Sequence, residues 1–232
     1  MARPVCAVVG IGPGNGAALA RRFGSDHRVA LLSRTTDLAA KLTAEIGEAR
    51  AYACDVADAD SIGRTFDAIA ADLGPVDTLV YNAGSGVFAT VEEITPAQFE
   101  AAWRINANGL LIAAQKVIPA MKAKGSGAII VIGATASRRG APRTAAFAPA
   151  KAAQRSLAES MAKHLGPAGI HVALIIIDGV VDLPRTRRSM PDKPDDFFVK
   201  PEDVAETAYW LAHQARSAWS FEVEARPFGE RW

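Results

Sequence analysis

The sequence predicts a single α/β domain in which helices cover both faces of a doubly wound parallel sheet. Short apolar, β-branched runs alternate with longer amphipathic segments along the 232 residues, which is the pattern of repeated strand–helix units. One of these runs, residues 170–177, is almost entirely apolar, as expected for a strand buried on both faces. No linker-like or low-complexity stretch divides the chain, so we expect residues 1–232 to form one domain.

Composition and charge argue against several classes of function. Lys and Arg total 26 against 25 Asp and Glu, a formal net charge of +1. A protein that binds nucleic acid or a membrane surface would need a basic patch, so we expect neither partner. No apolar run has membrane-spanning length and no signal peptide is recognisable, which favours a cytoplasmic protein. Cys6 and Cys54 lack metal-ligand spacing, so we expect reduced thiols and no metal site.

The first strand, turn and helix carry a phosphate-binding pattern. An apolar run, Val5–Val9, comes before a helix-forming stretch, and the turn between them contains Gly10, Gly14, Asn15 and Gly16. Phosphate is bound by backbone N–H donors at the positive end of a helix dipole, and glycines let it approach the backbone. Gly-x-Gly-x-x-Gly does not fit because position 15 is Asn, whereas Gly-x3-Gly-x-Gly does. We predict dinucleotide binding here; the alternative is a tight turn without a ligand.

The remaining elements alternate in the same way. We expect strands at residues 28–33, 49–54, 76–81, 127–133 and 170–177, and a half-covered strand near 221–225. We expect helices at residues 17–23, 36–46, 58–73, 95–121, 144–165 and 201–211. Thr95, Asp58 and either Thr36 or Thr35 are suited to cap three of these helices. Residues 183–199 are polar with three prolines, so we expect an irregular loop on the substrate side.

Asn82-Ala83-Gly84 follows the strand at 76–81. Together with the glycine turn, this triplet resembles the short-chain dehydrogenase/reductase family, whose fold is Rossmann-like. The resemblance covers nearly the whole chain and implies that Asn82, Ala83 and Gly84 lie beside a nicotinamide cofactor. Tyr81 stands where the family usually has a further Asn, which we expect to alter local hydrogen bonding.

The resemblance also implies the residues around the adenosine half of that cofactor. Asp55 would accept a hydrogen bond from the adenine amino group, with Val56 beside it; Asp55 as a helix cap is the alternative. An acidic residue at the end of the second strand would bind a free ribose 2′-hydroxyl, but Ser33 and Arg34 stand there. A hydroxyl and a guanidinium suit a 2′-phosphate. We therefore predict NADP rather than NAD; a solvated surface Arg is the alternative.

The catalytic positions depart from the family pattern. The family uses a Tyr to exchange a proton, a Lys four residues later, a Ser that orients the substrate oxygen, and a helix Asn that holds a water beside the Lys. The matching residues here are Phe147, Lys151, Ala134 and Asn106, with Asn108 as an alternative to Asn106. Because Phe cannot donate a proton and acid–base catalysis is worth ~10²–10⁴-fold, the ordinary family reaction should be severely weakened.

Asp178-Gly179 replaces the family's Pro-Gly after the sixth strand. The resemblance places Gly179 and Val181 at the nicotinamide, with the Val181 backbone bonding the carboxamide. A carboxylic acid in a dry pocket can donate a proton, so Asp178 is a candidate catalytic residue; a turn-forming Asp-Gly is the alternative. Thr135 and Ser137 are either shifted replacements for the Ser or ordinary loop hydrogen-bonders.

Three functional hypotheses follow. The first is an NADP-dependent oxidoreductase whose proton relay is rewired through Asn106, Lys151 and Asp178, with a small-molecule substrate such as an activated alkene or an iminium. The second is an NADP-binding sensor or structural subunit without turnover. The third is lyase or isomerase chemistry on the same fold. Family members commonly pair the helices that carry Asn106 and Lys151, so we expect a homodimer or homotetramer.

Overall fold

The computed structural model describes residues 2–230, so Met1 and residues 231–232 of the predicted domain lie outside it. Seven parallel strands form the main sheet in the order β3-β2-β1-β4-β5-β6-β9. They are β1 (Val5–Val9), β2 (Arg28–Ser33), β3 (Ala49–Ala53), β4 (Thr78–Tyr81), β5 (Gly127–Ala134), β6 (Ile170–Ile177) and β9 (Glu222–Ala225). The order reverses between β1 and β4, so a ligand crevice is expected at the carboxyl ends of these strands.

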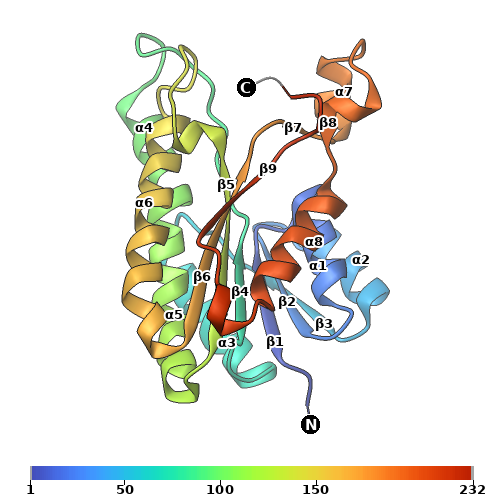
Figure 1. Cartoon of the computed structure of the whole chain (residues 1–232), viewed down its shortest axis with the longest axis vertical. Helices are drawn as coiled ribbons and strands as arrows, with labels where there is room; N and C mark the ends of the chain where they lie inside the picture. The colour runs from blue at the N-terminus through green and yellow to red at the C-terminus, as the bar shows by residue number, and fades with distance from the viewer. Residues whose placement is uncertain (1, 231–232) are drawn as a thin grey trace.

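Helices cover both faces of this sheet (Figure 1), which confirms the predicted fold class. One layer contains α1 (Asn15–Phe23), α2 (Asp37–Ile46) and α8 (Pro201–Ala212). The other contains α3 (Ala59–Asp72), α4 (Pro96–Trp103), α5 (Gly109–Lys124) and α6 (Phe147–Leu165). Each layer packs on the sheet through its own cluster of buried apolar side chains.

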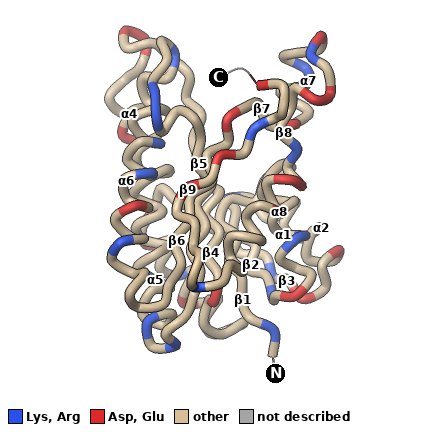
Figure 2. Tube along the Cα trace, in the orientation of Figure 1, with Lys and Arg blue, Asp and Glu red and all other residues tan. Residues whose placement is uncertain are grey.

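Charged residues of both signs are spread over the two layers (Figure 2). None of the helices in the described part of the chain combines the length and the apolar character that crossing a membrane requires.

The helix predicted at 95–121 is continuous but contains a π-helical segment, η1 (Arg104–Asn108), between α4 and α5. The Tyr81 hydroxyl donates to the Ile105 carbonyl in this segment at 2.5 Å. A side chain on Gly109 would collide with that hydroxyl, so glycine is needed for the close approach. Tyr81 therefore does alter the local hydrogen bonding, by joining the end of β4 to the helix that carries Asn106.

The capping predictions have mixed outcomes. Thr95 forms a capping box with Gln98, and Asp58 accepts from the Asp60 backbone N–H. The Thr36 side chain makes no cap hydrogen bond. The helix predicted to start at residue 144 begins instead at Phe147.

The prediction of an irregular loop at 183–199 is wrong in part. This segment contains α7 (Pro184–Ser189), a 3₁₀ turn, η4 (Asp195–Phe197), and β8 (Phe198–Val199), which pairs with β7 (Val180–Val181). Arg187 holds the segment together, because its guanidinium bonds Asp182 at 2.7 Å and Asp195 at 2.6 Å and lies 4.1 Å from the centre of the Phe198 ring. Short 3₁₀ turns complete the chain at η2 (Thr135–Ser137), η3 (Gly166–Ala168) and η5 (Arg216–Ala218).

Candidate functional site

The glycine turn after β1 packs directly against the end of β4. Gly10 has a φ of +98°, and a Cβ there would lie 2.5 Å from the Ala83 backbone nitrogen, so only glycine fits without strain. The Asn82 side chain donates from Nδ2 to the Gly10 carbonyl at 2.7 Å. The structure thus brings Gly10, Asn82 and Ala83 together at the crevice between β1 and β4.

One feature of this turn favours a bound anion, and a second favours a ligand that donates a hydrogen bond. No side chain caps the N-terminus of α1, which leaves backbone N–H groups for a ligand. The Asn15 Oδ1 atom is buried and has no hydrogen-bond partner among residues 2–230. A methyl group of Leu183 rests on Gly14, so the segment after β6 borders the same turn.

The residues predicted to bind the adenosine half lie at the ends of two neighbouring strands, β2 and β3. Arg34 is exposed, and no ion-pair partner for it occurs in the described chain. Ser33 donates its hydroxyl to the Thr35 carbonyl at 2.7 Å. Asp55 Oδ1 accepts from the Ala57 backbone at 3.0 Å, while Val56 is buried. Arg34 is therefore the side chain here that is free to meet a phosphate.

The centre of the site is a buried polar network of Lys151, Gln154 and Asn106. The Lys151 ammonium donates to the Ile132 carbonyl at 3.1 Å and to Gln154 Oε1 at 2.9 Å. Gln154 Nε2 donates to the Asn106 carbonyl at 3.0 Å. The resemblance implies a water between Asn106 and Lys151; in this chain the Gln154 amide spans the two groups.

Burial changes the chemistry of Lys151. Desolvation lowers the pKa of its ammonium from 10.5 to about 8, with no carboxylate partner to oppose it. A side chain with a pKa near neutrality can both hold and release a proton at physiological pH. Lys151 is thus suited to proton exchange as well as to hydrogen bonding.

Two groups in this network are open toward Gly84. The third N–H of Lys151 meets no acceptor within the described residues, and the buried Asn106 Oδ1 atom likewise meets no donor there. A Cβ on Gly84 would lie 3.5 Å from Lys151 Nζ and 3.3 Å from Asn106 Oδ1, so both atoms face one spot. A ribose hydroxyl, which donates and accepts, would satisfy both. The residues present therefore fit a nicotinamide nucleotide.

Apolar groups occupy the position of the missing proton donor. Phe147, the first residue of α6, has its ring centre 6.0 Å from Lys151 Nζ and 5.3 Å from the ring centre of Phe88. Ala134 is the last residue of β5. Ser137 is buried and its hydroxyl has no partner among residues 2–230, but it lies three residues beyond Ala134.

Asp178 lies in a different network, which ties the loop after β6 to β9. Its carboxylate accepts from the Thr135 hydroxyl and pairs with Arg226 at 3.0 Å. Its backbone N–H donates to the Ala225 carbonyl at 2.9 Å. Gly179 packs on Pro227. The backbone leading to Val181 is therefore held from the side of β9.

Sequence reasoning missed Gln154 and Arg226 as members of the site. Gln154 lies three residues after Lys151, and this helical spacing placed both side chains on one face. Arg226 gave no comparable signal, because its partner Asp178 is distant in sequence.

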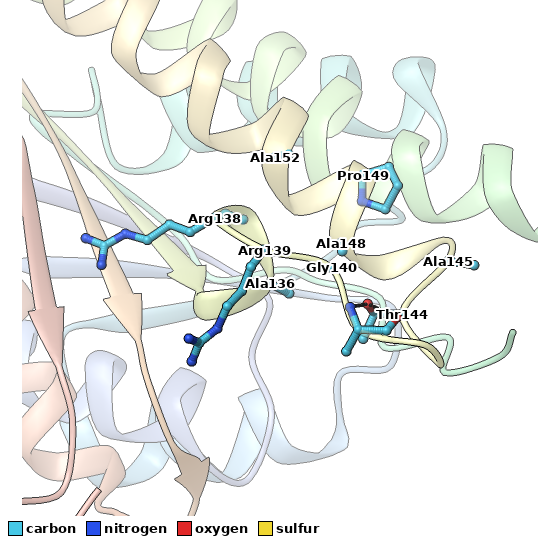
Figure 3. Close-up of a pocket in the computed structure, with 11 residues that line it drawn as sticks. Ala136, Arg138, Arg139, Gly140, Thr144, Ala145, Ala148, Pro149 and Ala152 are labelled. Atoms are coloured by element: carbon cyan, nitrogen blue, oxygen red, sulfur yellow. Dashed lines mark hydrogen bonds between the residues drawn. The ribbon is translucent and has the colours of Figure 1, made fainter. Parts of the chain in front are cut away.

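A separate pocket of 310 Å³ opens between η2 and the outer face of α6. Its walls include Ser137, Thr144, Ala148, Pro149 and Ala152. Figure 3 shows the Arg138 side chain extending away from Pro149 and Ala152. Neither Lys151 nor Asn106 lines this pocket, so it is distinct from the nucleotide crevice.

Comparison with known proteins agrees with this geometry. The family model described as "short chain dehydrogenase" matches residues 4–193. D-threitol dehydrogenase of Mycolicibacterium smegmatis is 30% identical over 224 residues, which span 91% of this chain and 86% of that protein. The 3-oxoacyl-[acyl-carrier-protein] reductase MabA of Mycobacterium tuberculosis H37Rv is 32% identical over 181 residues, which span 78% of this chain and 70% of that protein.

A solved structure of similar size supports the same assignment. A metagenomic short-chain oxidoreductase in complex with NADP superposes with a TM-score of 0.85 at 29% identity, covering 99% of each chain. The family match over most of the chain and the relative at 30% identity show that the chain belongs to the short-chain dehydrogenase/reductase family.

Proposed function

We propose that the protein is an NADP-dependent oxidoreductase in which Lys151, rather than a tyrosine, is the proton-bearing side chain of the site. The observation that carries this proposal is the buried network of Lys151, Gln154 and Asn106, which has an open donor and an open acceptor toward Gly84. A chain that had lost all use of a nucleotide would not need a buried, desolvated ammonium at this position.

Two observations favour NADP over NAD. Arg34 offers an exposed guanidinium at the end of β2, and guanidinium groups bind phosphate in a bidentate manner. The metagenomic relative was solved with NADP. In this proposal Arg34 and Ser33 hold the 2′-phosphate, the turn with Gly10, Gly14, Asn15 and Gly16 holds the pyrophosphate, and Asp55 and Val56 border the adenine.

The substrate class follows from what the site lacks. NADPH supplies hydride when bound, and reduction of a ketone then requires a proton at the oxygen atom. Phe147 and Ala134 offer none. Hydride addition to an iminium carbon gives a neutral amine and needs no proton. Hydride addition to the β-carbon of a polarised alkene gives an enolate, which is less basic than an alkoxide, and Lys151 would then donate a proton to the α-carbon and regain it from solvent. We propose such a substrate, with Lys151 as the proton carrier.

Asp178 is the second candidate carrier. Its bonds to Thr135 and Arg226 also suit a role in fixing the loop that carries Gly179 and Val181 at the nicotinamide.

The test is a panel of enones, cyclic imines and ketones with purified protein and NADPH, following nucleotide absorbance. We expect turnover of at least one enone or imine, slower turnover of ketones, and loss of activity in Lys151→Met. Absence of turnover above background across the panel, in protein shown by calorimetry to bind NADPH, would contradict the proposal.

That result would favour a second candidate function, an NADP-binding protein without turnover. The packing of Phe147 against Phe88 favours this candidate, because an aromatic pair fills the place of the usual proton donor. A double variant, Ala134→Ser with Phe147→Tyr, supplies both hydroxyls and distinguishes the two candidate functions. Ketone reduction that appears only in the double variant would show that these groups alone had been lost.

We also propose a homodimer or homotetramer. Phe99, Trp103 and Leu111 are large apolar side chains exposed on the outer side of α4 and α5. Large exposed apolar side chains on neighbouring helices can mark an interface.

A further inference from the structure

Gln154 is a fully buried amide on the inner face of α6, with 0% of its surface exposed. Apart from Lys151, the other buried side chains of this helix are small or apolar, such as Ala150, Ala158 and Met161. A buried amide destabilises a fold unless its donor and acceptor are both satisfied. Both are satisfied here, by the Asn106 carbonyl and the Lys151 ammonium.

The orientation of this amide is determined by its partners. The ammonium can only donate and the carbonyl can only accept, so Oε1 must face Lys151 and Nε2 must face Asn106. Asn106 itself is fixed by the bond from its Nδ2 to the Ala102 carbonyl at 2.8 Å. Gln154 therefore joins α6 to the π-helical segment η1 in one arrangement.

We propose that Gln154 is a positioning residue that sets both the placement and the proton affinity of Lys151; this inference rests on the proposed function. Ile132 and Gln154 take two of the three N–H donors of Lys151, so the third is directed toward Gly84 and the crevice. An amide does not titrate in water at ordinary pH, so it passes no proton into the interior. Lys151 then exchanges protons only on the crevice side.

The same amide also tunes the charge of Lys151. A neutral acceptor stabilises the ammonium, but less than a carboxylate would. Desolvation lowers the pKa of Lys151 to about 8, and the hydrogen bond to Gln154 Oε1 acts in the opposite direction. A variant that lacks the acceptor should lower the pKa of Lys151, and a variant with a carboxylate in its place should raise it. If Gln154 only filled space in the core, removing its acceptor would leave this pKa unchanged.

The experiment measures the Lys151 titration by NMR in protein with ¹³C-labelled lysines, without nucleotide, and assigns the signal with Lys151→Met. Gln154→Met keeps the length of the side chain and removes the acceptor, so the midpoint should fall by about one pH unit. Gln154→Glu places a carboxylate at the ammonium, so the midpoint should rise by about the same amount. Gln115→Met and Gln115→Glu, on an exposed position of α5, are the matched controls and should leave it unchanged.

An unchanged midpoint in Gln154→Met would overturn the inference. Movement of both Gln154 variants in the same direction would also overturn it. If Gln154→Glu does not fold, as judged by circular dichroism, the Gln154→Met result decides alone. The titration needs no substrate and no nucleotide, so a protein without turnover could still show opposite shifts of the Lys151 midpoint in the two Gln154 variants. Failure of the proposed oxidoreductase function can therefore be distinguished from failure of the proposed role of Gln154.

Discussion

Lys151 carries a buried charge that has no carboxylate partner within the described residues. The residue is 5% exposed, and its ammonium donates hydrogen bonds to the Ile132 carbonyl and to the amide oxygen of Gln154. Burying a charge without a counter-charge is unfavourable, and this desolvation lowers the pKa of Lys151 to about 8. The site therefore holds a group that is both unfavourable for stability and useful for proton exchange.

This penalty should be visible in the pH dependence of stability. The pKa of Lys151 falls from 10.5 to about 8 on folding, so between these values the unfolded chain binds a proton that the folded protein has released. Stability then rises with pH through that window. The free energy of unfolding of the wild type should gain on the order of 3 kcal/mol relative to Lys151→Met between pH 7 and pH 10.

Denaturation of both proteins with guanidinium chloride at several pH values measures this difference in free energy of unfolding. The contributions of the other titrating groups are the same in both proteins and cancel. A difference that stays constant from pH 7 to pH 10 would show that Lys151 keeps its ordinary pKa.

Arg34 should determine the choice of nucleotide. Its exposed guanidinium is proposed to bind a 2′-phosphate, and a charge-assisted bond contributes roughly 1.5–3 kcal/mol. We expect Arg34→Ala to weaken NADPH binding by about ten-fold or more and to leave NADH binding unchanged. Calorimetric titration with both nucleotides measures this. Arg64→Ala, at another exposed arginine, is the control, and equal weakening of both nucleotides would argue against the role.

The local sequence indicated individual residues such as Lys151 and Asn82, but it did not indicate the hydrogen bonds and ion pairs that join residues of different elements. The spacing of Phe147 and Lys151 on one helix face, and the register of Asn82 and Gly84, follow from local sequence. The bond from Gln154 to Asn106 joins two helices, and the pair of Asp178 with Arg226 joins two strands. Such partners depend on how elements pack, which no local pattern encodes.

At the scale of elements, Asp26 fastens the end of α1 to α8. Its carboxylate accepts from His27 Nδ1 at 2.6 Å and from the Tyr209 hydroxyl at 2.5 Å. Partial burial acts to raise the pKa of Asp26, but the hydrogen bonds from Tyr209 and His27 outweigh it, and the pKa is lowered. The ring of Tyr209 also lies 3.3 Å from the Arg22 guanidinium.

A carboxylate with a lowered pKa contributes stability above its ordinary pKa of 3.8, and this contribution is lost as pH falls through the folded value. Asp26→Asn should therefore lower the melting temperature at pH 6. The loss in free energy of unfolding should be less than about 1 kcal/mol, because solvent exposure of Asp26 screens its interactions. The difference from wild type should shrink as pH falls toward 3. Thermal melts followed by circular dichroism test this, and a difference that does not depend on pH would assign the effect to packing.

Elements were predictable where the signal is local. The strand at 170–177 is found at the predicted bounds because its sequence is apolar nearly throughout. The π-helical segment gave no signal in the local sequence, and its contact with Tyr81 comes from a distant strand. The helix and short strand within 183–199 were missed because Arg187 and its two carboxylate partners, rather than local propensity, stabilise them.

At the scale of the whole molecule, the outer face of α4 and α5 is proposed to bind a second copy of the chain. Trp103 on this face is 43% exposed, while Trp210 on α8, in the opposite layer, is 56% exposed. Trp103→Glu should therefore lower the molar mass measured by light scattering toward that of a monomer. Trp210→Glu should not, and an unchanged mass in both variants would place the interface elsewhere or exclude it.

The connection between β9 and the loop after β6 has a consequence for how the protein is made. Translation produces β9 after every other strand of the sheet, yet Ala225 and Arg226 hold Asp178 at the nucleotide edge. Until β9 has left the ribosome, the backbone that leads to Val181 lacks this support. Capture of the nucleotide by a nascent chain should thus wait until β9 has been synthesised and has paired with β6.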